Sequence, residues 1–120
     1  TQHGKIMNLR ALGCVGGNAL DIANAVRYAA GLENDSNVLP RKKADIINLS
    51  LSGTGDSRVL KAAIHAARAE GIIVIAAAGN SASSQAYYPV AYDGVIGVSA
   101  VDGECELAGK PYLKNDAFNW

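Results

Sequence analysis

The stretch Ile72–Asn80, which reads IIVIAAAGN, gives the clearest indication of the fold. Its apolar run lies between Gly71 and Gly79 and is too short for a membrane-spanning helix, which needs about 20 apolar residues. An aliphatic run without polar alternation is typical of a strand in a parallel sheet that helices cover on both faces. The stretch therefore predicts a buried strand over Ile72–Ala77, which small residues and the amide side chain of Asn80 follow.

Strand-like and helix-like patterns alternate around this stretch. Further strands are predicted over residues 5–12, 46–51 and 95–101. Strands that alternate with helices predict an α/β fold, with a parallel sheet flanked by helices on both faces. In such a sheet, ligand chemistry collects at the carboxyl ends of the strands.

Two helices are predicted between these strands. Polar residues can cap their starts, Asn18 in the first helix and Asp56 or Ser57 in the second. Apolar residues recur at helical spacing in both helices. The predicted buried faces are Ile22, Ala25, Val26 and Ala29 in the first helix and Val59, Leu60, Ala63, Ile64 and Ala67 in the second.

The composition narrows the class of protein. The 120 residues fit one domain, and 49% of them are hydrophobic, which is enough for a packed core. Eleven basic and 11 acidic residues cancel, which argues against a nucleic-acid or membrane partner. Cys14 and Cys105 cannot form a disulfide framework or a four-ligand zinc site on their own. Two free thiols are the favoured interpretation, and a bridge between them is the alternative.

Residues 13–17 (GCVGG) form a glycine-rich turn between the first predicted strand and the first helix. A turn of this kind before a helix N-terminus can bind a phosphate. Its glycines do not follow the G-x-G-x-x-G pattern, however, and no Gly-Lys-Ser/Thr sequence follows them. The favoured interpretation is a turn that needs a positive φ, and a small phosphate- or nucleotide-binding α/β domain is kept as an alternative.

Among the side chains that could carry chemistry, Asn80 is the strongest candidate. His65 lies inside the second predicted helix and His3 near the start of the chain, and neither has a partner at metal-ligand spacing. No G-x-S-x-G sequence occurs, which disfavours an α/β-hydrolase. An amide N–H beside a hollow lined by alanine and glycine can stabilise an oxyanion. An Asx-turn explains Asn80 equally well.

Four segments, taken together and in order, resemble the subtilisin-like serine proteases. They are KIMNLRALG at 5–13, DIINLSL at 45–51, AAAGN at 76–80, and YP at 88–89 with VIGVSAVD at 95–102. The family patterns that they match are V-L-G, V-I-N-M-S-L, A-A-A-G-N and Y-P…V-I-x-V-x-A-V-D. The resemblance covers residues 5–102 and leaves residues 103–120 unassigned. It identifies residues 1–120 as a partial subtilase-like catalytic domain.

The resemblance implies a role for each matching residue. Asn80 would be the oxyanion-hole side chain, which stabilises negative charge on the attacked carbonyl. The edge against which an extended peptide or protein substrate lies would consist of Ser50, Leu51, Ser52 and Gly53. The primary specificity pocket would have Ala77, Ala78 and Gly79 on one side and Tyr87 and Tyr88 on the other.

The catalytic triad of the family has no match in this sequence. The family needs Asp followed by Thr-Gly, His in an H-G-T-H-like helix start, and Ser in G-T-S-x-A, and the chain contains none of these. We therefore expect a fragment, or one processed chain, of a subtilisin-like serine endopeptidase that is inactive alone. A non-catalytic subtilase-like module for peptide binding or assembly is the alternative.

Two positions depart from the family within the binding segments. Ser52 stands where the family commonly has glycine, which puts close approach of the substrate there in doubt. Tyr87 stands where small residues are frequent. A large side chain at this position predicts a shallow pocket that prefers small or medium substrate side chains.

The resemblance also predicts a gap in the sheet. In the family, the strand with the catalytic Asp lies between the strands that resemble residues 5–12 and 46–51. Without it, both neighbours would have unpaired N–H and C=O groups. We therefore expect one of three outcomes. Another chain fills the gap, or the two strands pair directly with each other, or the rest of the protease completes the sheet.

Cofactor and location are implied only by the family. The resemblance requires no cofactor and allows a calcium ion held by backbone carbonyls in residues 90–95, after the Tyr-Pro motif. No metal-binding side chains are expected. A secreted or extracellular protein is implied.

Overall fold

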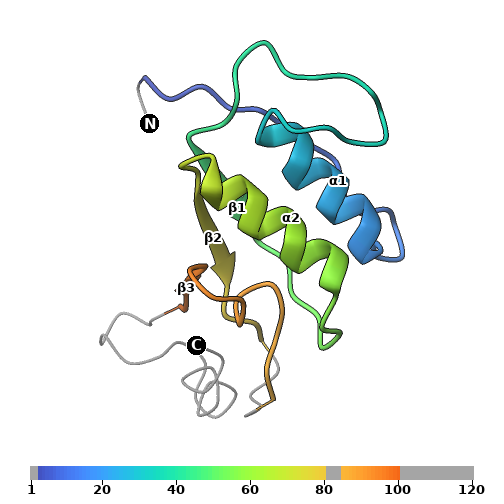
Figure 1. The fold of residues 1–120 in the computed structure, drawn as a ribbon. Helices are drawn as coiled ribbons and strands as arrows, with labels where there is room; N and C mark the ends of the chain where they lie inside the picture. The colour runs from blue at the N-terminus through green and yellow to red at the C-terminus, as the bar shows by residue number, and fades with distance from the viewer. Residues whose placement is uncertain (1–2, 81–84, 101–120) are drawn as a thin grey trace. The chain divides into compact units, whose positions relative to one another are not determined.

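The computed structural model describes residues 3–80 and 85–100 and contains the elements α1, β1, α2, β2 and β3 in chain order (Figure 1). The chain divides into two compact units. The helical unit consists of Thr1–Asp45 and Ser57–Ile72, and the sheet unit consists of Ile46–Asp56 and Ile73–Trp120.

In the helical unit, α1 (Ala19–Ala29) and α2 (Arg58–Ala69) lie side by side (Figure 1). Most of the predicted buried face is confirmed, since the residues buried in these two helices are Ile22, Ala23, Val26, Ala29, Leu60, Ala63, Ile64 and Ala67. Two residues differ from the prediction: Ala25 is only half-buried, and Val59 is 53% exposed. No helix in the described residues is long and apolar enough to cross a membrane.

Both helices begin at the predicted polar caps. The Asn18 side chain accepts a hydrogen bond of 2.8 Å from the backbone N–H of Asp21 and donates one of 2.8 Å to its carboxylate. Ser57, rather than Asp56, caps α2 and accepts a bond of 3.3 Å from the backbone N–H of Leu60. Each cap satisfies one of the N–H groups that a helix start leaves without a partner.

The predicted strand over residues 5–12 is wrong for this structure. These residues form no strand, and Ile6 is 89% exposed. The reason is that a strand is stable only when a neighbour accepts its backbone hydrogen bonds, and no backbone bond joins residues 5–12 to another described residue. Direct closing onto residues 46–51 is therefore not observed, and completion by another chain or by the rest of a protease stays a prediction.

The glycine-rich turn closes on itself. Gly13 N donates to Gly16 O (2.8 Å) and Gly16 N donates to Gly13 O (3.3 Å). Gly16 has a φ of +103°, which residues with a side chain rarely adopt. Because these two amides donate to each other's carbonyl, the geometry favours the turn interpretation over a phosphate site.

The sheet unit contains a parallel sheet of β1 (Ile46–Leu49), β2 (Ile73–Ala77) and β3 (Ile96–Val98), in that order. The sheet with helices in the same chain confirms the predicted α/β class. The strands are shorter than predicted: β1 ends before Ser50, and β3 spans only part of residues 95–101, of which Val101 lies outside the described residues.

The two faces of this sheet differ in exposure. On one face Ile47, Leu49, Val74 and Ala76 are buried. On the other, Ile46, Ile73, Ile96 and Val98 are 47–55% exposed, although all four are aliphatic. β2 is thus apolar on both faces, as predicted, and one face of the sheet is open in the described part of the chain.

Candidate functional site

All the site residues predicted from the sequence belong to the sheet unit. In the parallel pairing of β1 with β2, Leu49 lies opposite Ala76. The segment Ser50–Gly53 therefore leaves the sheet beside the end of β2, which Ala78–Asn80 follows. The carboxyl ends of neighbouring parallel strands are where α/β proteins place their ligands.

Residues Ser50–Gly53, which we call the substrate edge, are mostly open to solvent. Only Leu51 is half-buried, and the other three residues are exposed. The Asn48 side chain donates a hydrogen bond of 3.0 Å to Ser50 Oγ. The backbones of Leu51 and Ser52 make no hydrogen bond to another described residue. Unpaired, exposed backbone of this kind can receive an extended peptide by strand addition.

The far end of the substrate edge is fixed by an isolated antiparallel bridge. Gly53 N donates to Tyr88 O (2.9 Å), and Tyr88 N donates to Gly53 O (2.8 Å). Both residues were predicted to belong to the site, but no sequence pattern predicted this bond between them. No side chain takes part in this bond, so no residue type in the sequence could indicate it. The nearest sequence motif is the Tyr-Pro pair at 88–89.

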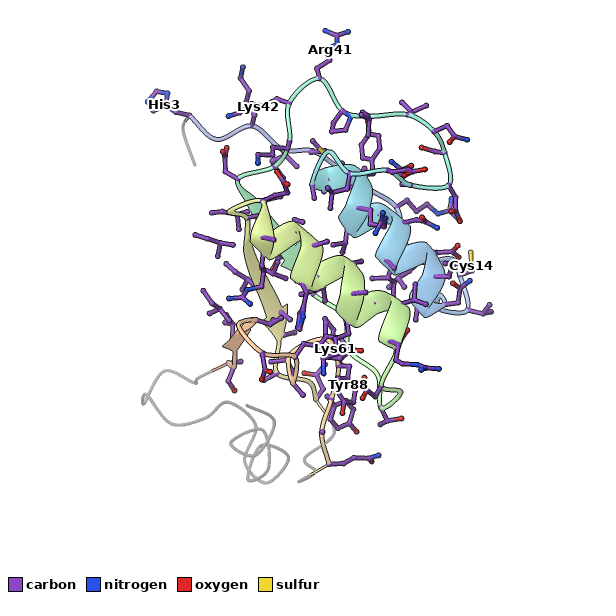
Figure 2. All side chains as sticks on the ribbon, in the orientation of Figure 1. His3, Cys14, Arg41, Lys42, Lys61 and Tyr88 are labelled. Carbon is purple, nitrogen blue, oxygen red and sulfur yellow. The ribbon has the colours of Figure 1, made fainter. Side chains whose placement is uncertain are left out.

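Tyr88 is itself anchored (labelled in Figure 2). Its ring packs against the ring of Tyr92, with centroids 4.8 Å apart and an angle of 38° between the planes. The peptide bond between Tyr88 and Pro89 is cis, and Pro89, Val90 and Tyr92 are buried. The bridge therefore connects the substrate edge to a well-packed segment.

The second segment of the site continues from β2. Ala78 is buried, and its N–H donates to Val98 O (3.0 Å). Gly79 has a φ of +106°, so the turn that leads to Asn80 requires glycine. Asn80 is exposed, and its side chain makes no hydrogen bond to another described residue. An Asx-turn would use residue 82, which lies outside the described residues.

Tyr87 and Tyr88 are both half-buried. The Tyr87 carbonyl accepts a bond of 2.9 Å from Ala91 N, which holds the residue at the start of the packed segment. The structure thus joins Tyr88 to the substrate edge and attaches Ala78 to β3. No backbone hydrogen bond among the described residues joins Tyr87 to residues 77–79.

The remaining candidates stay outside this site. His3 and His65 are exposed, and residues 3–80 and 85–100 contain no cluster of three or more His, Cys, Asp or Glu side chains that could hold a metal ion. Cys14 is a free, exposed thiol in the glycine-rich turn (Figure 2), and Cys105 lies outside the described residues. A calcium ion on the carbonyls of residues 90–95 stays a prediction.

Comparison with known proteins identifies the family of this chain. A sequence model of the subtilase family matches residues 3–112. The chain therefore belongs to the subtilase family and represents a segment of its catalytic domain.

Individual relatives match nearly the whole chain. It is 42% identical to a halolysin-like extracellular serine protease, Nep, from Natrialba magadii, over 96% of this chain and 22% of that protein. It is 41% identical to a thermophilic serine proteinase from Bacillus sp. (strain AK1), over 87% of this chain and 24% of that protein. The chain thus spans about a quarter of the length of these relatives.

A solved structure gives the same result for the fold. A protease from Pseudoalteromonas arctica PAMC 21717 superposes with a TM-score of 0.71 at 38% identity, over 77% of this chain and 28% of that one. The predicted fold, an incomplete subtilisin-like α/β domain, is confirmed.

Proposed function

We propose that this chain supplies the oxyanion-hole and peptide-binding segments of a subtilisin-like serine endopeptidase, whose Ser-His-Asp triad lies outside these 120 residues. The observation that carries the proposal is the backbone of Leu51 and Ser52, which makes no hydrogen bond to another described residue and lies at one strand end, next to the strand end that leads to Asn80. The serine protease names of the relatives support it.

In the proposed mechanism, an extended peptide pairs with the substrate edge and places its scissile carbonyl near Asn80. The triad serine attacks the carbonyl carbon while the triad histidine accepts the serine proton. The carbonyl oxygen becomes negative, and Asn80 Nδ2 donates a hydrogen bond to it. The amine product leaves with a proton from the histidine, and water then hydrolyses the acyl-enzyme. The residues of this chain bind the substrate and stabilise charge, and they form no covalent bond.

A nucleophile-directed probe tests this proposal. We expect a fluorophosphonate to label the protein encoded by the complete reading frame, since that protein would contain the triad serine. The 120-residue chain alone should remain unlabelled. Failure to label the full-length protein, together with no peptide hydrolysis, would favour a non-catalytic peptide-binding module. Labelling of the short chain would contradict a triad outside it.

The pocket of this proposal has Ala77, Ala78 and Gly79 on one side and Tyr87 and Tyr88 on the other. We expect the full-length enzyme to prefer small or medium side chains before the cleaved bond, because Tyr87 takes up room. Pocket size discriminates by about 10–200-fold per methylene group. Tyr87→Gly should therefore shift a peptide-library cleavage profile towards large aromatic residues by at least about tenfold, whereas Tyr87→Phe should not. A preference for large aromatics in the unmutated enzyme would refute the shallow pocket.

A secreted location is part of the proposal. It is supported by the relative from Natrialba magadii, which is named as an extracellular protease.

A further inference from the structure

We propose that the Gly53–Tyr88 bridge is a positioning element, which occupies one side of the substrate edge so that the backbone of Ser52 faces the peptide on the other side. This inference rests on the proposed function and adds to it a role for a contact between two backbones. Tyr88 then acts through Gly53, as a positioning residue.

The geometry of the bridge gives the substrate edge its direction. Gly53 and Tyr88 exchange both of their backbone hydrogen bonds, at 2.9 and 2.8 Å. In an antiparallel pair, the residue next to such a hydrogen-bonded pair turns its own N–H and C=O to the opposite side. Ser52 therefore turns its backbone groups away from the Tyr88 segment. Ser52 is an exposed residue, and its backbone groups have no hydrogen-bond partner among the described residues.

Both ends of the substrate edge are held. At its start, Leu49 is buried and paired in β1. At its end, Gly53 is bonded to Tyr88, whose ring lies 4.8 Å from that of Tyr92. Val90 and Tyr92 are only 6% and 3% exposed, so the segment that receives the bridge is part of the packed core. A backbone fixed before binding loses less conformational entropy when a peptide pairs with it.

The bridge also limits where a peptide can pair. The N–H and C=O of Gly53 are already used, so within the substrate edge an incoming strand finds free backbone only before this residue. The pairing register of a strand decides which side chain faces which site. Stopping the edge at Gly53 thus keeps the scissile bond in a constant position relative to Asn80.

The test uses the full-length enzyme with two substrates, a blocked tetrapeptide amide and a blocked single-residue ester. Only the tetrapeptide is long enough to pair along the substrate edge. Gly53→Pro removes the N–H that donates to Tyr88. We expect kcat/KM for the tetrapeptide to fall by about tenfold relative to the ester, mainly through KM. Gly53→Ala keeps the N–H, and a Cβ there would meet no atom within 4 Å, so this variant should recover most of the loss.

Gly55→Pro is the matched control. Gly55 lies outside the site, has open space around it and makes no backbone bond to another described residue, so the ratio between the two substrates should not change. An equal fall for both substrates in Gly53→Pro would show a merely structural bridge, and no fall would show that the bridge has no role. If the unmutated enzyme hydrolyses neither substrate, the proposed function fails, and the positioning role fails with it.

Amide hydrogen exchange decides the question even if Gly53→Pro does not fold. In the unmutated full-length protein, the amides of Gly53 and Tyr88 should exchange slowly with and without a peptide aldehyde inhibitor. The Ser52 amide should exchange quickly in the free protein and slowly in the complex. A Ser52 amide that is already protected in the free protein, or a Gly53 amide as fast as that of Ser52, would overturn the proposal.

Discussion

Replacing Asn80 with alanine in the full-length protein is expected to lower kcat for a peptide substrate by about 10²–10³-fold. This range was measured for the loss of an oxyanion-hole asparagine in subtilisin, a member of the same family. The amide N–H meets a full negative charge only in the transition state, so KM should stay nearly constant.

The stability of this variant provides the control. Asn80 is exposed, and its side chain makes no hydrogen bond to another described residue. The midpoint of thermal unfolding should therefore stay close to that of the unmutated protein, so that a lower kcat is not caused by unfolding. A variant with unchanged kcat would remove Asn80 from the proposed mechanism.

Replacing Ile64 with alanine is expected to lower the free energy of unfolding by about 2–5 kcal/mol. Ile64 is 0% exposed and is among the largest fully buried side chains of the described residues. Its removal leaves a cavity that the neighbouring side chains of the helical unit fill only in part. Equilibrium urea unfolding of the 120-residue chain, followed by far-ultraviolet circular dichroism, measures the change.

Val59→Ala is the matched control on the same helix. Val59 is 53% exposed, so its truncation should change the free energy of unfolding by less than about 0.5 kcal/mol. Helical spacing in the sequence placed both side chains in the core, and the structure separates them. Equal losses for the two variants would support the face predicted from the sequence over the one in the structure.

Local sequence patterns predicted the helices well because capping and periodicity act within a few residues. Asn18 and Ser57 cap the helices as expected. Val59 was misplaced because it lies at the edge of the buried face of α2. The residues buried in this helix, Leu60, Ala63, Ile64 and Ala67, follow the i, i+3, i+4, i+7 spacing, and Val59 lies one position before the first of them.

The strand over residues 5–12 could not be judged from its own sequence. Its apolar residues fit a strand, but a strand also needs a neighbour for its hydrogen bonds, and that neighbour is not encoded locally. β2 was predicted almost to the residue. A run of seven consecutive apolar residues indicates a buried strand by itself, whichever strand lies next to it.

For the candidate site, the sequence motifs indicated which residues take part but not which hydrogen bonds join them. The A-A-A-G-N and Y-P segments pointed to Asn80 and Tyr88 because particular side chains are needed there. The bond between Gly53 and Tyr88 joins two backbones, which every residue except proline can provide, so no residue type reveals it.

The open aliphatic face of the sheet governs how the chain behaves by itself. Burying an isoleucine or valine side chain gains about 1.5–3 kcal/mol, and Ile46, Ile73, Ile96 and Val98 leave much of this gain unrealised. In a concentrated solution these side chains favour self-association, and the attraction grows on moderate warming because apolar hydration weakens on cooling. Dilute, cold conditions are accordingly the ones in which the separate chain stays dispersed.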